Sequence, residues 1–159
     1  MPSSPPPGPA LSGRTTLPRI LIADDNPQGV ELLEAYLEGN DYEIRTAADG
    51  EETWRQVREW QPDLILLDIM MPKISGFEVC KRLRADPATR EIAVLMITAL
   101  DQPSDVDRAV EAGTDEFLTK PINKQGMLLR VRALLKTRQY KRDLDRALAY
   151  IEAVERGEK

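Results

Sequence analysis

Residues 63–77, DLILLDIMMPKISGF, contain the segment that decides the fold. The run Leu64–Leu67 is apolar throughout, has the length of a strand and ends in the carboxylate of Asp68. A strand that is apolar on both faces is typical of the middle of a parallel sheet with helices on either side. Ligands of such sheets bind outside the carboxyl ends of the strands, which is where Asp68 would stand.

The composition is that of an ordinary globular protein and excludes several classes of function. Of 159 residues, 42% are apolar and 31% are charged. No apolar run approaches the roughly 20 residues of a membrane span or forms a secretion signal. The single cysteine, Cys80, suits a reducing cytoplasm, where we expect the protein to be located. The net charge of −5 argues against nucleic-acid binding, and the absence of histidine removes His-based catalysis, His metal ligands and any phosphohistidine within these residues.

Short apolar segments alternate with helical patterns along the chain. Residues 1–17 are rich in Pro, Ser and Gly and are predicted to be a disordered tail. Five strands are expected, at Arg19–Ala23, Tyr42–Thr46, Leu64–Leu67, Ile92–Thr98 and Glu116–Thr119. A stretch with helical spacing follows each strand. This alternation indicates an α/β fold with a doubly wound, five-stranded parallel sheet and right-handed crossovers.

The ends of the predicted strands carry polar side chains. Asp24 and Asp25 follow the first strand, and Asp68 follows the third. Thr98 ends the fourth strand and Lys120 follows the fifth. Taken singly, these residues could be a helix cap, a turn residue, a strand residue and a solvated charge. Because each lies at the same relative point of its own βα unit, we expect them to meet at one edge of the sheet.

Three carboxylates in one pocket require compensating cations. Two carboxylates about 4 Å apart repel by roughly 4 kcal/mol at an effective dielectric constant near 20. Lys120 would supply one positive charge, and a hard divalent cation is the natural second. An oxygen-only ligand set with room for water suits Mg²⁺ better than Zn²⁺.

Four motifs carry a specific resemblance to a known family. They are ILIADDN (20–26), LILLDIMMPKISGFE (64–78), VLMITA (94–99) and FLTKP (117–121). Together they resemble the receiver domain of response regulators in two-component, histidine-to-aspartate phosphorelay systems. The resemblance covers residues 18–136 and implies a flavodoxin-like sheet in the order 2-1-3-4-5. It also implies a phosphoacceptor switch that catalyses only its own phosphorylation and dephosphorylation.

The resemblance assigns the nucleophile and the metal ligands. Asp68 would accept a phosphoryl group from a phosphohistidine of a sensor histidine kinase or phosphotransfer protein. Asp24 and Asp25 would hold Mg²⁺, with Asp25, Asp68 and the Met70 backbone carbonyl as direct ligands. Such a transfer requires mainly positioning and neutralisation of charge on the phosphoryl oxygens. A carboxylate is a competent nucleophile without a general base, so the lack of histidine is no obstacle.

The resemblance also implies a switch. Lys120 and the Thr98 hydroxyl would each bind a phosphoryl oxygen, and the Lys120–Pro121 bond resembles the family's cis peptide. Thr98 would draw the loop after the fourth strand inward, and the aromatic side chain of Phe117 would turn into the vacated space. Phe117 lacks the hydroxyl of the commoner tyrosine, so this readout would rest on packing. An ordinary core phenylalanine is the alternative.

Met70 and Leu100 resemble the family's variable rate-setting positions at the mouth of the pocket. Both side chains are apolar, and neither can orient an attacking water. We therefore predict a comparatively long-lived phosphoryl group.

Residues 137–159 are predicted to form a helical extension. Tyr140, Leu144, Ala147, Ile151 and Val154 follow one another at spacings of four and three, which is a heptad-like pattern. Two heptads are fewer than the three or four on which a coiled-coil assignment rests. A dimerising coiled coil and a single helix that folds back on the domain therefore both remain open.

Several functions compete at this point. The leading one is a stand-alone switch that acts through contacts with a downstream protein. A second is the regulatory module of an effector enzyme, because LLRVRALLKTRQYKRDL (128–144) resembles linkers that join receivers to cyclic-dinucleotide enzymes. The complete pocket disfavours a phosphorylation-independent adaptor. The lack of a glycine-rich phosphate loop after the first strand disfavours a flavodoxin-like cofactor binder.

Overall fold

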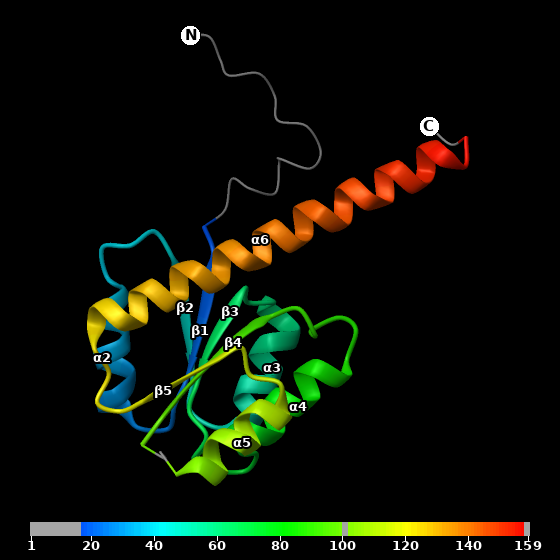
Figure 1. Ribbon diagram of the computed structural model, residues 1–159. Helices are drawn as coiled ribbons and strands as arrows, with labels where there is room; N and C mark the ends of the chain where they lie inside the picture. Colours follow the sequence, from blue (N-terminus) through cyan, green and yellow to red (C-terminus); the bar gives the residue numbers. More distant parts are fainter. Residues whose placement is uncertain (1–16, 100–101, 158–159) are drawn as a thin grey trace, which may run out of the picture.

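The computed structural model describes residues 17–99 and 102–157, and within them strands and helices alternate (Figure 1). The strands are β1 (Arg19–Ala23), β2 (Glu43–Ala47), β3 (Leu64–Leu67), β4 (Ala93–Thr98) and β5 (Glu116–Thr119). The helices are α2 (Pro27–Leu37), α3 (Gly50–Trp60), α4 (Gly76–Ala85), α5 (Pro103–Ala112) and α6 (Lys124–Glu155). The predicted tail lies outside the described residues except for Leu17.

The five strands form one parallel sheet in the order β2-β1-β3-β4-β5. β3 lies in the middle, paired with β1 on one side and β4 on the other, and Leu64–Leu67 are all buried. The predicted α/β fold and strand order are confirmed. β2 and β4 begin one residue later than predicted, because the N–H groups of Tyr42 and Ile92 donate to carbonyls of the preceding turns.

Helices lie on both faces of the sheet (Figure 1), and an apolar core fills the space between the sheet and the helices on each face. α3, α4 and α5 pack on one face, where Ile65 and Leu67 of β3 contribute. α2 and α6 pack on the other, where Leu64 and Leu66 contribute. Asp68 therefore follows a strand that is held from both sides.

Side-chain caps fix the beginnings of four helices. The capping residues are Asn26 of α2, Asp49 of α3, Ser75 of α4 and Asn123 of α6. Such a cap stabilises a helix by about 1 kcal/mol. The cap of α2 is Asn26, whose side chain accepts from the Gln28 N–H, and not the neighbouring site residue Asp25.

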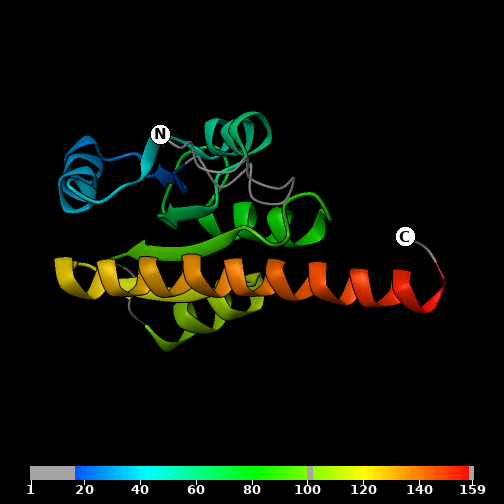
Figure 2. The ribbon, with the colours of Figure 1, turned by 90° about the horizontal axis from the view of Figure 1, so that it is seen from above.

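α6 has 32 residues, runs along the sheet and then projects beyond it (Figures 1 and 2). Met127, Leu128 and Val131 of its first part are buried in the core. The predicted extension is thus continuous with the last helix of the domain up to Glu155, and the fold-back alternative is not observed. No helix among the described residues combines the length and apolar character needed to cross a membrane.

Cys80 on α4 is expected to be inert in the folded protein. Its side chain is fully buried, and burial raises the pKa of its thiol to about 11. Because the thiolate is the reactive form, and a raised pKa keeps the thiol protonated at pH 8, an aromatic disulfide reagent should not react with the native protein. One thiol should react in denaturant, since the chain has one cysteine. Rapid reaction of the reagent with the native protein would contradict the burial of the Cys80 thiol.

Candidate functional site

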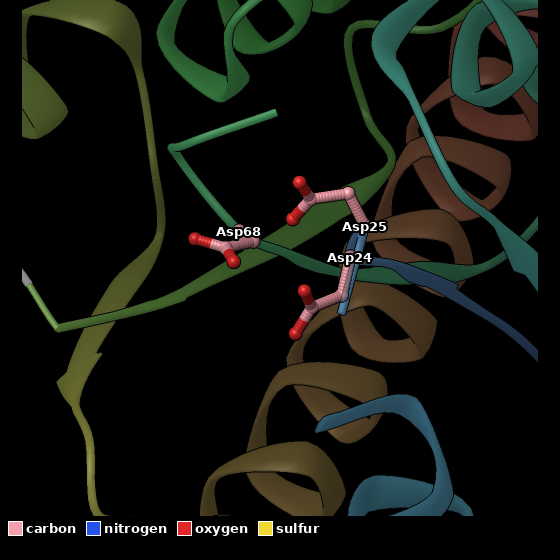
Figure 3. A group of neighbouring side chains, drawn as sticks. All are labelled: Asp24, Asp25 and Asp68. Carbon is pink, nitrogen blue, oxygen red and sulfur yellow. The ribbon is translucent and has the colours of Figure 1, made fainter. Parts of the chain in front are cut away.

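Three carboxylates converge at the carboxyl ends of β1 and β3. The register pairs Ala23 with Leu67, so the next residues, Asp24 and Asp68, leave adjacent strands at the same level. One carboxylate oxygen from each of Asp24, Asp25 and Asp68 lies within 4.8 Å of the others. Figure 3 shows the side chains of Asp24 and Asp25 at the end of β1 and that of Asp68 beside them at the end of β3, all three extending toward the same side. The structure therefore brings these predicted site residues together.

Lys120 reaches this group from the end of β5. Its Nζ lies 3.4 Å from Oδ2 of Asp24 and 3.5 Å from Oδ2 of Asp68. Asp24 and Asp68 are 3% and 7% exposed, whereas Asp25 is open to solvent. The bond that follows the lysine, Lys120–Pro121, is cis. One ammonium group thus partly neutralises two buried carboxylates.

Backbone N–H groups donate to the two buried carboxylates, Asp24 and Asp68, and burial changes the pKa of Asp68. The Asn26 N–H donates to Oδ1 of Asp24 over 2.9 Å, and the Met70 N–H donates to Oδ1 of Asp68 over 3.2 Å. Burial, followed by the nearby Asp24 carboxylate, raises the pKa of Asp68. The Lys120 ammonium and the Met70 N–H lower this pKa and only partly offset the rise.

The residues fit a divalent cation. Three carboxylates against one ammonium leave two uncompensated negative charges when all are ionised. The donor set contains oxygen alone, which Mg²⁺ prefers, and exposed Asp25 leaves the group open to solvent, so a metal could keep bound waters. Asp24, Asp25 and Asp68 are the side chains that could hold it.

The other predicted site residues occupy different places around the carboxylates. Thr98 is buried at the end of β4, and its carbonyl accepts from the Lys120 N–H over 2.8 Å. Phe117 on β5 is half-buried and packs against the core under α3, α4 and α5. Met70 is 62% exposed beside Asp68. Leu100 lies outside the described residues.

Two glycines that the sequence did not single out approach the site closely. A Cβ on Gly29 of α2 would lie 2.8 Å from Oδ2 of Asp24. A Cβ on Gly76, the first residue of α4, would lie 2.3 Å from the backbone oxygen of Asp68. The sequence contains one indication of both contacts. Glycine in the first turn of a helix lowers helix propensity, so its presence there indicates that a side chain would not fit.

Comparisons with known proteins agree with this geometry. A sequence model of the response regulator receiver domain matches residues 20–132. The chain is 48% identical over 120 residues to the DNA-binding dual master transcriptional regulator RpaA of Synechocystis, across 76% of this chain and 50% of RpaA. It is 47% identical over 116 residues to the response regulator PleD of Caulobacter vibrioides, across 73% of this chain and 26% of PleD.

Solved structures show the same fold. A crystal structure of a putative response regulator from Chloroflexus aurantiacus is 37% identical and superposes with a TM-score of 0.73, over 76% of this chain and 99% of that one. The chain spans half or less of the length of RpaA and PleD. The matched residues include both strand ends that carry the carboxylates. The chain is a member of the response regulator receiver domain family.

Proposed function

We propose that this chain is a phosphoacceptor switch in which Asp68 takes a phosphoryl group in a Mg²⁺-dependent reaction. The observation that carries the proposal is the position of Asp68, 7% exposed, beside the Asp24 carboxylate and 3.5 Å from the Lys120 ammonium. A carboxylate in this setting can act as a covalent nucleophile, and the Lys120 ammonium provides positive charge beside it for the negative phosphoryl oxygens.

The proposed step is phosphoryl transfer from a histidine. A carboxylate oxygen of Asp68 forms a bond to phosphorus as the bond from phosphorus to the donor imidazole nitrogen breaks, and the imidazole leaves with that electron pair. Lys120 and the Thr98 hydroxyl hold two phosphoryl oxygens. Asp24, Asp25 and Asp68 would hold Mg²⁺, which would supply positive charge to the phosphoryl oxygens. The 159 residues contain no histidine, so the donor belongs to a sensor histidine kinase or phosphotransfer protein outside them.

An apolar hollow beside the site suits docking of such a donor. Its volume is about 210 Å³. Its apolar lining includes Leu32, Leu33 and Tyr36 of α2 and Pro121 and Ile122 before α6, and the site residues Asp24 and Lys120 also line it. A protein that packs apolar side chains here would place its phosphohistidine near Asp68.

The proposed output is a change in the face formed by β4, α5 and β5. The phosphoryl group gives Thr98 a new partner, and half-buried Phe117 repacks in response. The changed face then binds a downstream protein. We also propose that copies of the chain associate through the projecting part of α6.

A second candidate is the regulatory module of a larger effector protein. The match to the response regulator PleD favours it, because the matched part is 26% of that protein. RpaA, whose name describes DNA binding, is also about twice the length of the matched part. The predicted lack of nucleic-acid binding stays a prediction for these 159 residues.

Mg²⁺ is expected to stabilise the protein through the three carboxylates, and this tests the proposed site. A ligand that binds only the folded state adds about 2.7 kcal/mol to the free energy of unfolding when its free concentration is one hundred times its Kd. The Asp25→Ala variant removes an exposed ligand and should bind Mg²⁺ at least tenfold more weakly, measured by calorimetric titration. Asp41→Ala, an exposed aspartate before β2, is the control. Equal Mg²⁺ affinity in the two variants would contradict the assignment.

Met70 is expected to slow loss of the phosphoryl group. Its thioether is exposed at the site and cannot orient water for attack on phosphorus. The Met70→Asn variant presents an amide that can, so its phosphoprotein should decay several-fold faster in buffer, measured by intact mass against time. Leu129→Asn, which changes an exposed leucine on α6, should decay like the wild type. An unchanged half-life of Met70→Asn would refute this role.

A further inference from the structure

The projecting part of α6 presents an apolar stripe, here called the α6 seam, formed by Tyr140, Leu144, Ala147, Ile151 and Val154. Its four larger side chains are between 50% and 64% exposed. Helices in proteins gain most of their stability from burying an apolar face against a partner. The seam is therefore apolar surface that a partner helix could bury.

Ion pairs near the beginning of the seam favour the direction in which α6 leads away from the chain's own domain. Arg138 Nη1 lies 2.6 Å from Oδ1 of Asp63, and Arg138 Nε donates to the Glu91 carbonyl over 3.1 Å. Lys141 Nζ lies 2.7 Å from Oε1 of Glu91. Oδ2 of Asp63 accepts from the Arg19 N–H over 2.8 Å, so the carboxylate that binds Arg138 is also hydrogen-bonded to β1. The C-terminal part of α6, which carries the seam, extends away from the sheet (Figure 2).

We infer that the partner helix belongs to a second copy of this chain and that the two α6 seams pair in antiparallel orientation. In heptad terms Leu144 and Ile151 are a positions, and Tyr140, Ala147 and Val154 are d positions. A parallel pair would place Ala147 against Ala147 and leave a gap in the middle of the seam. An antiparallel pair places Ala147 against Ile151 and Leu144 against Val154. Pairing of large with small side chains fills such a core.

The residues beside the seam favour the same orientation. A parallel pair would bring Leu148 opposite Asp143 of the second copy, and Tyr150 opposite Glu155. An antiparallel pair brings Leu148 near Leu148 and Tyr150 near Tyr150, close to the two-fold axis. Leu148 and Tyr150 are 50% and 71% exposed, so each has apolar surface to bury.

The charged residues beside the α6 seam also favour the antiparallel orientation. In a parallel pair Lys136 would face Lys141 of the second copy, which is repulsive. In an antiparallel pair Lys141 faces Glu155. The Lys141 side chain is 55% exposed in its pair with Glu91 and can interact with a second carboxylate.

The orientation rests on the proposed self-association and not on phosphorylation of Asp68, so the test uses unphosphorylated full chain in Mg²⁺-free buffer. Sedimentation equilibrium should show a reversible dimer. Leu144→Asp, within the seam, should weaken it at least tenfold, and Leu129→Asp, an exposed leucine of α6 outside the seam, should not. A monomer at every concentration overturns the inference and leaves phosphorylation untouched.

Disulfide formation between copies distinguishes the orientations. Buried Cys80 does not compete. Oxidation should crosslink Tyr150→Cys protein at least tenfold faster than Ala147→Cys protein, because position 150 meets itself near the two-fold axis of an antiparallel pair. Position 147 meets itself in a parallel pair. Crosslinking of Ala147→Cys at an equal or higher rate overturns the antiparallel arrangement.

Discussion

Replacing Asp68 with asparagine is expected to abolish phosphorylation of the protein by acetyl phosphate. The amide is close in shape to the carboxylate, and its oxygen can still accept from the Met70 N–H, so the pocket keeps its form. A neutral amide oxygen is not a competent nucleophile toward phosphorus. Intact mass spectrometry should show the added phosphoryl group on the wild type and on Asp41→Asn, and none on Asp68→Asn. Full phosphorylation of Asp68→Asn would exclude Asp68 as the acceptor.

The same variant should fold at least as stably as the wild type at pH 7 without Mg²⁺. Burial and Asp24 raise the pKa of Asp68, so the folded state binds this proton more tightly than the unfolded state. The free energy of unfolding therefore falls as pH rises from the unfolded pKa to the folded pKa, and the ionised carboxylate destabilises the folded protein above that window. Asparagine removes this charge. Urea denaturation separates lost chemistry from lost folding.

Replacing Gly76 with alanine is expected to lower the free energy of unfolding by roughly 3 kcal/mol, at the upper end for overpacking. The added Cβ would lie 2.3 Å from the Asp68 backbone oxygen and 2.7 Å from the Ile69 Cα. Both are backbone atoms and cannot rotate away. Either α4 or the turn after β3 must shift, which would also displace Asp68 and slow its phosphorylation.

Gly126→Ala is the matched control for Gly76→Ala. Gly126 lies in the first turn of α6, and a Cβ there would be 3.4 Å from Oδ1 of Asn123, an ordinary contact. Alanine at this helical position should stabilise the protein by up to about 1 kcal/mol. Urea denaturation measures both variants. If Gly76→Ala were as stable as Gly126→Ala, the close packing of α4 on the Asp68 turn would be wrong.

The sequence predicted the strands and the convergence at their ends because both follow from local patterns. Leu64–Leu67 is apolar on both faces, which a central strand alone can bury. Carboxyl ends of parallel strands share one edge, so Asp24 and Asp68 had to approach each other once the strands were neighbours. The strand order itself came from the resemblance of the motifs.

The features that the sequence did not predict depend on distances between segments far apart in the chain. Gly76 and Gly29 are needed because a side chain there would collide with atoms of Asp68 and Asp24. The presence of a glycine in the sequence does not show which atoms it approaches. Asp63 and Arg138 are two of many charged residues until the fold brings them to 2.6 Å. The spacing of the α6 seam fits a folded-back helix and a projecting one equally. The ion pairs of Arg138 with Asp63 and of Lys141 with Glu91, before β3 and β4, favour the projecting one.

The most direct test of the proposed switch is to locate the phosphoryl group on the wild-type protein. The full chain is incubated with acetyl phosphate, with Mg²⁺ or with chelator, and the acyl phosphate is trapped by borohydride reduction before peptide mass spectrometry. The expected result is one modified residue, Asp68, that forms with Mg²⁺ and not with chelator. Modification at another residue, or equal modification of Asp68 in the presence of chelator, would contradict the proposed reaction.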